Sequence, residues 1–155
     1  MTSKLPELIY APQDDPPFRV DAVVVEEDTG LVLSADTEIK LKDEHPIRLM
    51  MALWDFTPET PGTIVVKGRN PFRLFAIVHD FDAEPSCKKE WVLASLHAAL
   101  QKCKKLGVLS LGMQLLGSRY GSIEKEWFID ELEKALWRYK GNQLQKLWLM
   151  LAPER

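Results

Sequence analysis

The sequence is poor in cysteine, carries no excess of positive charge and has no long apolar run. Its two cysteines, Cys87 and Cys103, fall in one predicted helix about 24 Å apart, too far for a disulfide, so we expect free thiols. Lys and Arg number 20 against 23 Asp and Glu, which argues against binding nucleic acid through its phosphates. The apolar runs are shorter than a membrane span, and the first residues lack the apolar core of a signal peptide. We therefore expect a cytoplasmic protein that does not contact a membrane.

Sequence motifs of common catalytic and metal sites are also missing. The chain contains neither a Gly-x-Gly-x-x-Gly segment nor a Walker-type phosphate loop. Ser110 lies between glycines one residue too far apart for a nucleophile elbow. The three histidines, His45, His79 and His97, do not show metal-ligand spacing. No metal or cofactor is therefore predicted, and a small hydrolase built on Ser110, Ser118 and His79 is only an alternative.

A single domain covering residues 1–155 fits the length and the ordinary content of 46% apolar and 28% charged residues. In the N-terminal half, short β-branched runs broken by Pro and Gly indicate mainly strands. The predicted elements are an edge strand at 8–11, a buried strand at Val20–Glu26, a hairpin at 31–41, a short helix at 46–57, and a second hairpin formed by Thr63–Lys67 and Phe72–His79.

The C-terminal half alternates between helical and extended patterns. One helix is predicted with Ser86 as its N-cap and Gly107 just past its end, and Ser122 is the predicted cap of a second helix. The strands Val108–Met113 and Leu144–Leu151 follow these two helices in turn. Such alternation is typical of an α/β fold, in which crossover helices pack on the faces of parallel strands.

The loop Gly117–Ser122 is the main candidate site, because it joins a predicted parallel strand to the start of a helix. Ligands of such sheets bind beyond the carboxyl ends of the strands, and a helix N-terminus favours an anion. Gly117 and Gly121 permit close approach of the backbone, Arg119 offers a fork of donors, and Tyr120 is placed to cover a ligand. The same residues also fit a plain turn, in which the glycines serve geometry alone.

Several segments, taken in chain order, match the pattern of one known family. They are the strand Val20–Val24, the stretch Gly62–His79, the strand Val108–Ser110, the loop Leu116–Gly121 and the closing strand Leu147–Leu151. Together they resemble the macro domain, an ADP-ribose-binding module whose phosphate loop reads Gly-Thr-Gly-x-Tyr-Gly. The resemblance implies a three-layer α/β/α fold around a mixed sheet. It also implies that Asp14, seven residues before Asp21, stands where the family's aspartate contacts adenine.

The departures from this pattern concern the ligand site itself. The family's Asn-Ala-Ala-Asn segment reads Val25–Asp28 here, and a predicted hairpin replaces the glycine-rich loop that normally follows. Leu116 and Ser118 stand where the phosphate loop usually has glycines. The acidic residues Glu26, Glu27 and Asp28 would oppose a diphosphate lying close by. For these reasons no catalytic residue of the family is carried over to this chain.

Two hypotheses follow. In the first, the chain binds ADP-ribose or a similar nucleotide diphosphate without catalysis and without a cofactor. Its expected ligand-binding residues are Asp14, Gly117, Ser118, Arg119, Tyr120 and Gly121. In the second, the fold serves protein interaction or regulation, and the pocket is degenerate and closed. A homodimer stays open as well, because apolar periodicity does not distinguish a core face from a dimer face.

Overall fold

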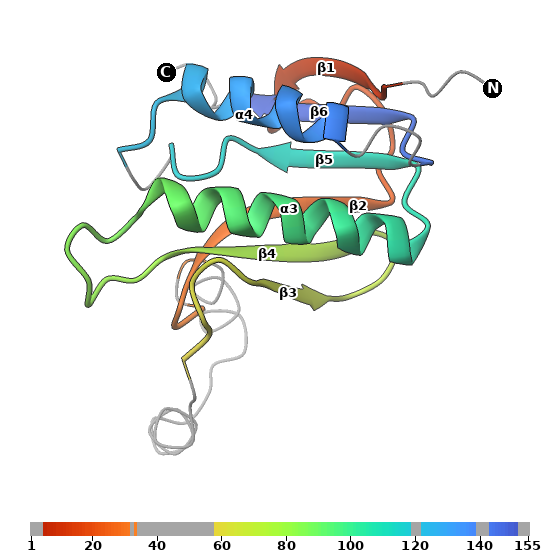
Figure 1. Ribbon diagram of the computed structural model, residues 1–155. Helices are drawn as coiled ribbons and strands as arrows, with labels where there is room; N and C mark the ends of the chain where they lie inside the picture. The colour runs from red at the N-terminus through yellow and green to blue at the C-terminus, as the bar shows by residue number, and fades with distance from the viewer. Residues whose placement is uncertain (1–4, 32, 34–57, 119–121, 139–142, 152–155) are drawn as a thin grey trace.

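A computed structural model describes residues 5–31, 33, 58–118, 122–138 and 143–151 of the chain. They form a six-stranded sheet in the order β1-β6-β5-β2-β4-β3, together with two helices (Figure 1). The elements are β1 (Glu7–Pro12), β2 (Ala22–Asp28), β3 (Ile64–Lys67), β4 (Phe72–His79), α3 (Lys89–Leu106), β5 (Ser110–Gln114), α4 (Lys125–Arg138) and β6 (Lys146–Leu151).

The sheet is mixed, and its parallel part carries the site. Neighbouring strands from β1 through β6, β5 and β2 to β4 are all parallel, whereas β3 pairs antiparallel with β4. Because α4 connects the neighbouring parallel strands β5 and β6, it forms a crossover of the kind that the alternating sequence predicts. The hairpin β3–β4 is also as predicted, with Gly68 in the left-handed region of its turn at φ +73°. The predicted α/β fold with a mixed sheet is confirmed.

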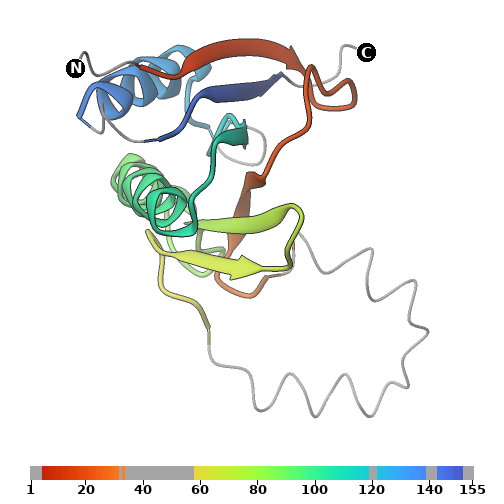
Figure 2. The ribbon, with the colours of Figure 1, turned by 90° about the vertical axis from the view of Figure 1, so that its right-hand side faces the viewer.

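Helices α3 and α4 both lie on one face of the sheet, as the two perpendicular views show (Figures 1 and 2). They form the helical layer that the described residues contain. The short helix predicted at 46–57 lies outside these residues, and the hairpin predicted at 31–41 lies almost entirely outside them.

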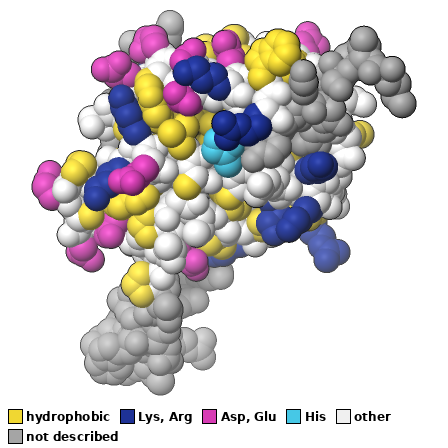
Figure 3. All heavy atoms as spheres, viewed as in Figure 1, with side chains coloured by type: hydrophobic (Ala, Val, Ile, Leu, Met, Phe, Trp, Pro, Cys, Tyr) yellow, Lys and Arg dark blue, Asp and Glu magenta, His cyan; other side chains and the backbone are white. Residues whose placement is uncertain are grey.

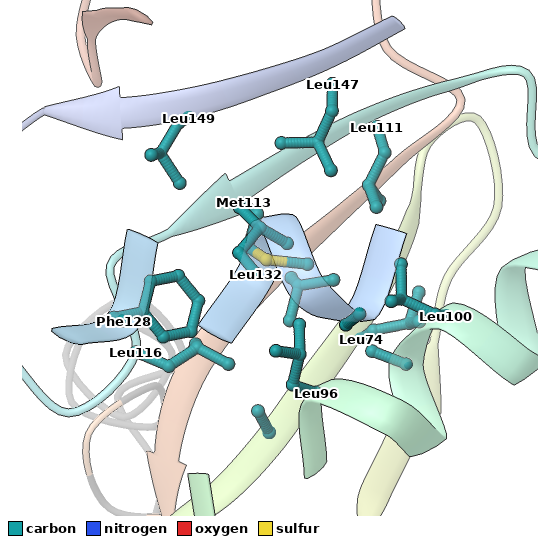
Figure 4. Close-up of a cluster of buried hydrophobic side chains, with 14 of the residues drawn as sticks. Leu74, Leu96, Leu100, Leu111, Met113, Leu116, Phe128, Leu132, Leu147 and Leu149 are labelled. Atoms are coloured by element: carbon teal, nitrogen blue, oxygen red, sulfur yellow. The ribbon is translucent and has the colours of Figure 1, made fainter. Parts of the chain in front are cut away.

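The core fills the space between the helices and the sheet (Figure 4). Its largest fully buried apolar side chains come from both layers, and burying one of them contributes roughly 1.5–3 kcal/mol. They include Leu74, Leu96, Leu100, Leu111, Met113, Leu116, Phe128, Leu132, Leu147 and Leu149. The apolar stripes that predicted the two helices are therefore the faces that pack on the sheet.

The predicted start of α3 is wrong. The helix begins at Lys89, and its N-cap residue Lys88 makes no side-chain cap. The carbonyl of Ser86 instead accepts the N–H of Asp80 at 2.7 Å, and Cys87 forms an antiparallel bridge with His79. This long-range pairing keeps Ser86 and Cys87 extended, so Cys87 lies before the helix rather than in it. Both cysteines are free, as expected, and both are buried.

The predicted cap of α4 is also wrong, whereas the predicted end of α3 is confirmed. Helix α4 begins at Lys125, and the N–H of Phe128 bonds the carbonyl of Glu124, so Ser122 stands too early in the chain to cap it. At the end of α3, Gly107 adopts φ +72°, a left-handed conformation that glycine enters without a steric cost. This turn sends the chain directly into β5.

Candidate functional site

The carboxyl ends of β1, β6, β5 and β2 meet at one edge of the sheet, because these strands are parallel. Beside this edge lies a cavity of about 50 Å³. Its lining comes from the ends of these strands and from the connection to α4: Gln13, Glu26, Gln114, Leu115, Ser118, Lys125 and Met150. The cavity therefore lies where ligands of parallel sheets are expected.

The side chain of Gln114 lies at this edge of the sheet and bonds two neighbouring segments. Its Oε1 accepts the backbone N–H of Glu26 at 2.9 Å, and its Nε2 donates to Oε1 of Gln13 at 3.4 Å. Gln114 thereby joins the ends of β5 and β2 to the turn after β1. In the same region Nε1 of Trp148 donates to the carbonyl of Ala11 at 3.0 Å and holds β1 against β6. These hydrogen bonds hold the strand ends in place, and the bonded side chains occupy space that a ligand would otherwise take.

Glu26, which lines the cavity, forms a buried pair with His79. Nε2 of His79 is 2.6 Å from Oε2 of Glu26, and both side chains are fully buried. The ring of Phe81, itself 54% exposed, stacks on His79 with centroids 5.7 Å apart. Burial, and then the negative charge of Glu26, raise the pKa of the Cys87 thiol to about 11. Near neutral pH this thiol is protonated and is not an activated nucleophile.

The remaining acidic residues at the end of β2 organise the backbone. Oε1 of Glu27 accepts the N–H of Asp28 at 3.0 Å. The carboxylate of Asp28 accepts the N–H groups of Gly30 and Leu33, each at 2.9 Å. With the contact of Glu26 to His79, this bonding explains why three consecutive acidic residues are buried at a strand end: each has a polar partner, and Asp28 holds the turn that follows.

The first part of the Gly117 loop is a close-packed turn. Gly117 has φ +82°, and a Cβ atom there would lie 2.7 Å from Cγ1 of Ile123 and 3.1 Å from Cγ2 of Val92. The N–H and the hydroxyl of Ser118 both donate to the carbonyl of Leu115, at 3.1 and 2.7 Å. Gly117 therefore serves backbone geometry and packing, and the donors of Ser118 are engaged inside the turn.

The structure brings together part of the site that the sequence predicts. Ser118 lines the cavity, whereas Asp14 is exposed in the turn after β1, where its neighbour Gln13 supplies the lining. Arg119, Tyr120 and Gly121 lie outside the described residues.

Sequence reasoning did not include the other six lining residues among the ligand contacts. Two of them are apolar, and the four polar ones are Gln13, Glu26, Gln114 and Lys125. The signal that could have found Glu26 and Gln114 is a polar residue that ends an otherwise apolar strand pattern. For Gln13 and Lys125 such a signal is lacking, since polar residues are common in turns and at helix starts.

No group of three His, Cys, Asp or Glu side chains that could hold a metal ion occurs in the part of the chain that the structure describes. In this part, too, none of the helices has the length and apolar character of a membrane span.

Comparison with solved structures identifies the fold. The macrodomain of Mycobacterium tuberculosis DarG matches with a TM-score of 0.69 at 15% identity, over 94% of this chain and 99% of that one. The macrodomain of Thermus aquaticus DarG matches with a TM-score of 0.66 at 17% identity, over 93% of this chain and 97% of that one. Thermosipho africanus DarTG, solved in complex with ADP-ribose, matches with a TM-score of 0.60 at 15% identity, over 88% and 39%. No family model and no curated protein matches the sequence.

These matches show the fold of the chain. The chain has the macro-domain fold: it has a mixed six-stranded sheet, and the match covers 97% and 99% of the two DarG macrodomains. The resemblance in sequence is thereby confirmed at the level of fold, in a strongly divergent form. At 17% identity or less, the roles of individual residues have to be argued from this chain alone.

Proposed function

We propose that this chain binds ADP-ribose or a similar nucleotide diphosphate at the carboxyl edge of its sheet, and that it does not hydrolyse the ligand. The observation that supports the proposal is the position of the cavity, beside the strand ends and the start of α4, in a chain of macro-domain fold. A macro-domain-fold protein in complex with ADP-ribose gives the ligand class.

The lining supplies groups suited to such a ligand. Lys125 is the first residue of α4 and adds a positive charge at the N-terminus of that helix, where the helix dipole also favours a phosphate. The amides of Gln13 and Gln114 have donors and acceptors for a base or a ribose, and Glu26 accepts from a hydroxyl. Arg119, Tyr120 and Gly121 are proposed to complete the phosphate contacts, with Asp14 at the adenine.

Entry of the ligand requires side chains to move. A cavity of about 50 Å³ has room for water, whereas nucleotide sites are generally several times larger. Rotamer changes at binding surfaces are common. Gln13 lies in the turn after β1 and Lys125 is the first residue of α4, whereas the hydroxyl of Ser118 is bonded inside its own turn. We propose that these two side chains swing outward when the ligand binds.

The proposed lack of catalysis rests on the state of the nearby nucleophiles. The hydroxyl of Ser118 is bonded to a carbonyl, and the thiol of Cys87 is protonated near neutral pH. Neither arrangement activates a nucleophile.

Titration calorimetry with ADP-ribose, ADP, AMP and adenosine tests the proposal. We expect ADP-ribose and ADP to bind more tightly than adenosine, and Lys125→Gln to weaken ADP-ribose at least about fivefold, the loss of one phosphate contact. Lys134→Gln is the matched control, because Lys134 lies on the same helix, exposed and paired with Asp130 at 3.1 Å. The absence of heat with all four compounds at millimolar concentration contradicts the proposal.

One observation favours a second function, that of a protein-interaction module with a closed pocket. The Gln114 network and the inward bonding of Ser118 leave little room at the strand ends. Arg119→Glu separates the two functions. Loss of nucleotide binding supports the first, and loss of self-association or partner binding in a folded variant supports the second.

A further inference from the structure

A second hollow lies between the edge strand β3 and helix α3. It is separate from the cavity at the carboxyl ends of the parallel strands. It has a volume of about 250 Å³. Ile64 of β3 and Ala98 of α3 give it apolar walls, while Gln101, Lys102 and Lys105 line it from the last turns of α3. We propose that this hollow, together with the open edge of β3, binds an acidic peptide segment in extended conformation.

The first support is the open backbone edge of β3. The strand pairs only with β4 among the described strands, so one of its edges has no partner strand there. The N–H of Ile77 donates to the carbonyl of Thr63, so the backbone carbonyl of Thr63 points toward β4. Because these directions alternate along an antiparallel strand, the N–H and C=O groups of Ile64 and Val66 face outward. They are available to a seventh strand that adds to the sheet.

The second support is charge. Residues 62–79, which contain β3, its turn and β4, include no Asp or Glu but carry Lys67, Arg69 and Arg73. Lys67 and Arg73 lie over the ring of Phe75, on the sheet face away from α3, so the positive charges at the hollow itself are those of Lys102 and Lys105. Figure 3 shows Lys and Arg side chains gathered over the C-terminal part of α3. In a protein with a net charge of −3 this is a local basic surface, and it favours a partner rich in Asp or Glu.

The third support is the way the two features meet. Side chains of Ile64 and Val66 pack toward the core beneath α3, so alternate side chains of an added strand would point to the same side. On that side they would meet Gln101, Lys102 and Lys105. Carboxylates at every second position of the peptide would therefore face the lysines, while the backbone pairs with β3.

The observations favour this partner over two others. A second copy of the chain that paired through β3 would bring Lys102 and Lys105 of both copies close to the same strand edge, and like charges repel. A free anion or a nucleic acid would use the lysines but would leave the open strand edge unpaired. An acidic peptide uses both features.

The test is fluorescence anisotropy of a labelled peptide in which Glu alternates with Val, with the full chain as receptor. We expect binding at up to millimolar protein, and none by a peptide in which Lys replaces Glu. The double variant Lys102→Glu/Lys105→Glu should weaken binding at least about tenfold, through two lost pairs and the added repulsion. Lys104→Glu is the matched control, because Lys104 lies in the same turns, is exposed and does not line the hollow.

Two further peptides test strand pairing without altering the protein. In one, N-methyl groups occupy the amides of the Glu residues, and in the other, those of the Val residues. Since only one set of amides faces β3, we expect one peptide to bind like the parent and the other to lose binding. Equal binding by both overturns the proposal, because it shows attraction by charge alone.

Three other outcomes also overturn it. One is an equal loss of binding in Lys104→Glu and in the double variant. Another is full competition by a single-stranded oligonucleotide at lower concentration than the peptide. The third is a dimer in sedimentation analysis that the double variant disrupts without peptide. Far-UV circular dichroism and thermal unfolding of each variant confirm that the fold is kept.

Discussion

His79 and Glu26 are joined by a contact of 2.6 Å between Nε2 and Oε2, and neither side chain reaches solvent. The contact links β4 to β2, two neighbouring parallel strands, at their carboxyl ends. Glu26 also borders the cavity proposed for the ligand. One carboxylate thus connects the stability of the sheet edge with the shape of the site.

Removal of that carboxylate is expected to destabilise the protein. Glu26→Ala leaves the buried ring of His79 without this acceptor, and breaking a buried pair costs about 3 kcal/mol or more. Glu26→Gln keeps an oxygen in place and should cost clearly less. Urea unfolding followed by tryptophan fluorescence measures both losses. As a control, Glu133→Ala changes an exposed carboxylate on α4 and should leave stability nearly unchanged; a loss for Glu26→Ala as small as that of the control refutes the prediction.

Gly107, which follows α3, and Gly117, in the turn after β5, are both left-handed, and they should differ in their tolerance of alanine. At Gly117, alanine combines φ +82° with a Cβ atom 2.7 Å from Ile123, so we expect a loss of about 3 kcal/mol. At Gly107, with φ +72°, the nearest atom is Nε2 of Gln143 at 3.5 Å, and the backbone term alone costs about 1–2 kcal/mol. Thermal unfolding of Gly117→Ala and Gly107→Ala ranks them. Equal losses would mean that Gly117 is not required for packing.

The sequence predicted these elements unequally, for physical reasons. The hairpin β3–β4 and the stripes of α3 and α4 are local patterns, and burial on one face leaves a period that can be read directly. The position of the Gly117 loop followed from the same local signals, because a strand followed by a helix fixes where the loop lies. The caps failed where long-range pairing decided, as in the bridge between His79 and Cys87.

The details of the site depended on contacts that no local pattern encodes. Gln114 bonds the backbone of Glu26, 88 residues earlier in the chain. Neither segment contains a local sequence pattern that predicts this contact. The departures from the macro-domain pattern at Val25–Asp28 pointed to this strand end as unusual. They did not reveal that the carboxylates of Glu26 and Asp28 bond the protein's own His79, Gly30 and Leu33.

The buried thiols should make stability fall at alkaline pH. Burial, with the charge of Glu26, raises the pKa of Cys87 from 9.0 to about 11, and burial raises the pKa of Cys103 from 9.0 to about 12. A raised folded pKa gives stability that is complete below the unfolded pKa and is lost as pH rises through the folded one. Between pH 9.0 and about 11, each thiol should therefore steepen the decline of unfolding free energy by up to about 1.4 kcal/mol per pH unit.

Urea unfolding at closely spaced pH values measures this slope. Cys87→Ala/Cys103→Ala should show a shallower decline than the parent, whatever its stability at neutral pH. Because the two proteins share every other side chain, the difference between the two curves isolates the thiols. Parallel curves above pH 9.0 would disprove the assignment.

The pKa of His97, on α3, should respond in opposite directions to the removal of two charges on α4. Burial, and then the positive charge of Arg138, lower the pKa of His97 from 6.5, while the negative charge of Glu131 raises it. Arg138→Gln should therefore raise the pKa of His97, and Glu131→Gln should lower it further. Because the neutral ring is favoured in the folded protein, His97 contributes stability that is complete above pH 6.5 and is lost as pH falls below that value.

Proton NMR titration of the His97 ring measures both shifts, and urea unfolding across pH 5–7 measures the linked stability. Arg138→Gln should flatten the loss of stability on the acidic side, because it brings the folded pKa closer to the unfolded one. Lys134→Gln is the control on the same helix, since Lys134 is fully exposed and is paired with Asp130. A His97 pKa that moves in the same direction in Arg138→Gln and Glu131→Gln would show that these two charges do not act on the ring as the structure requires.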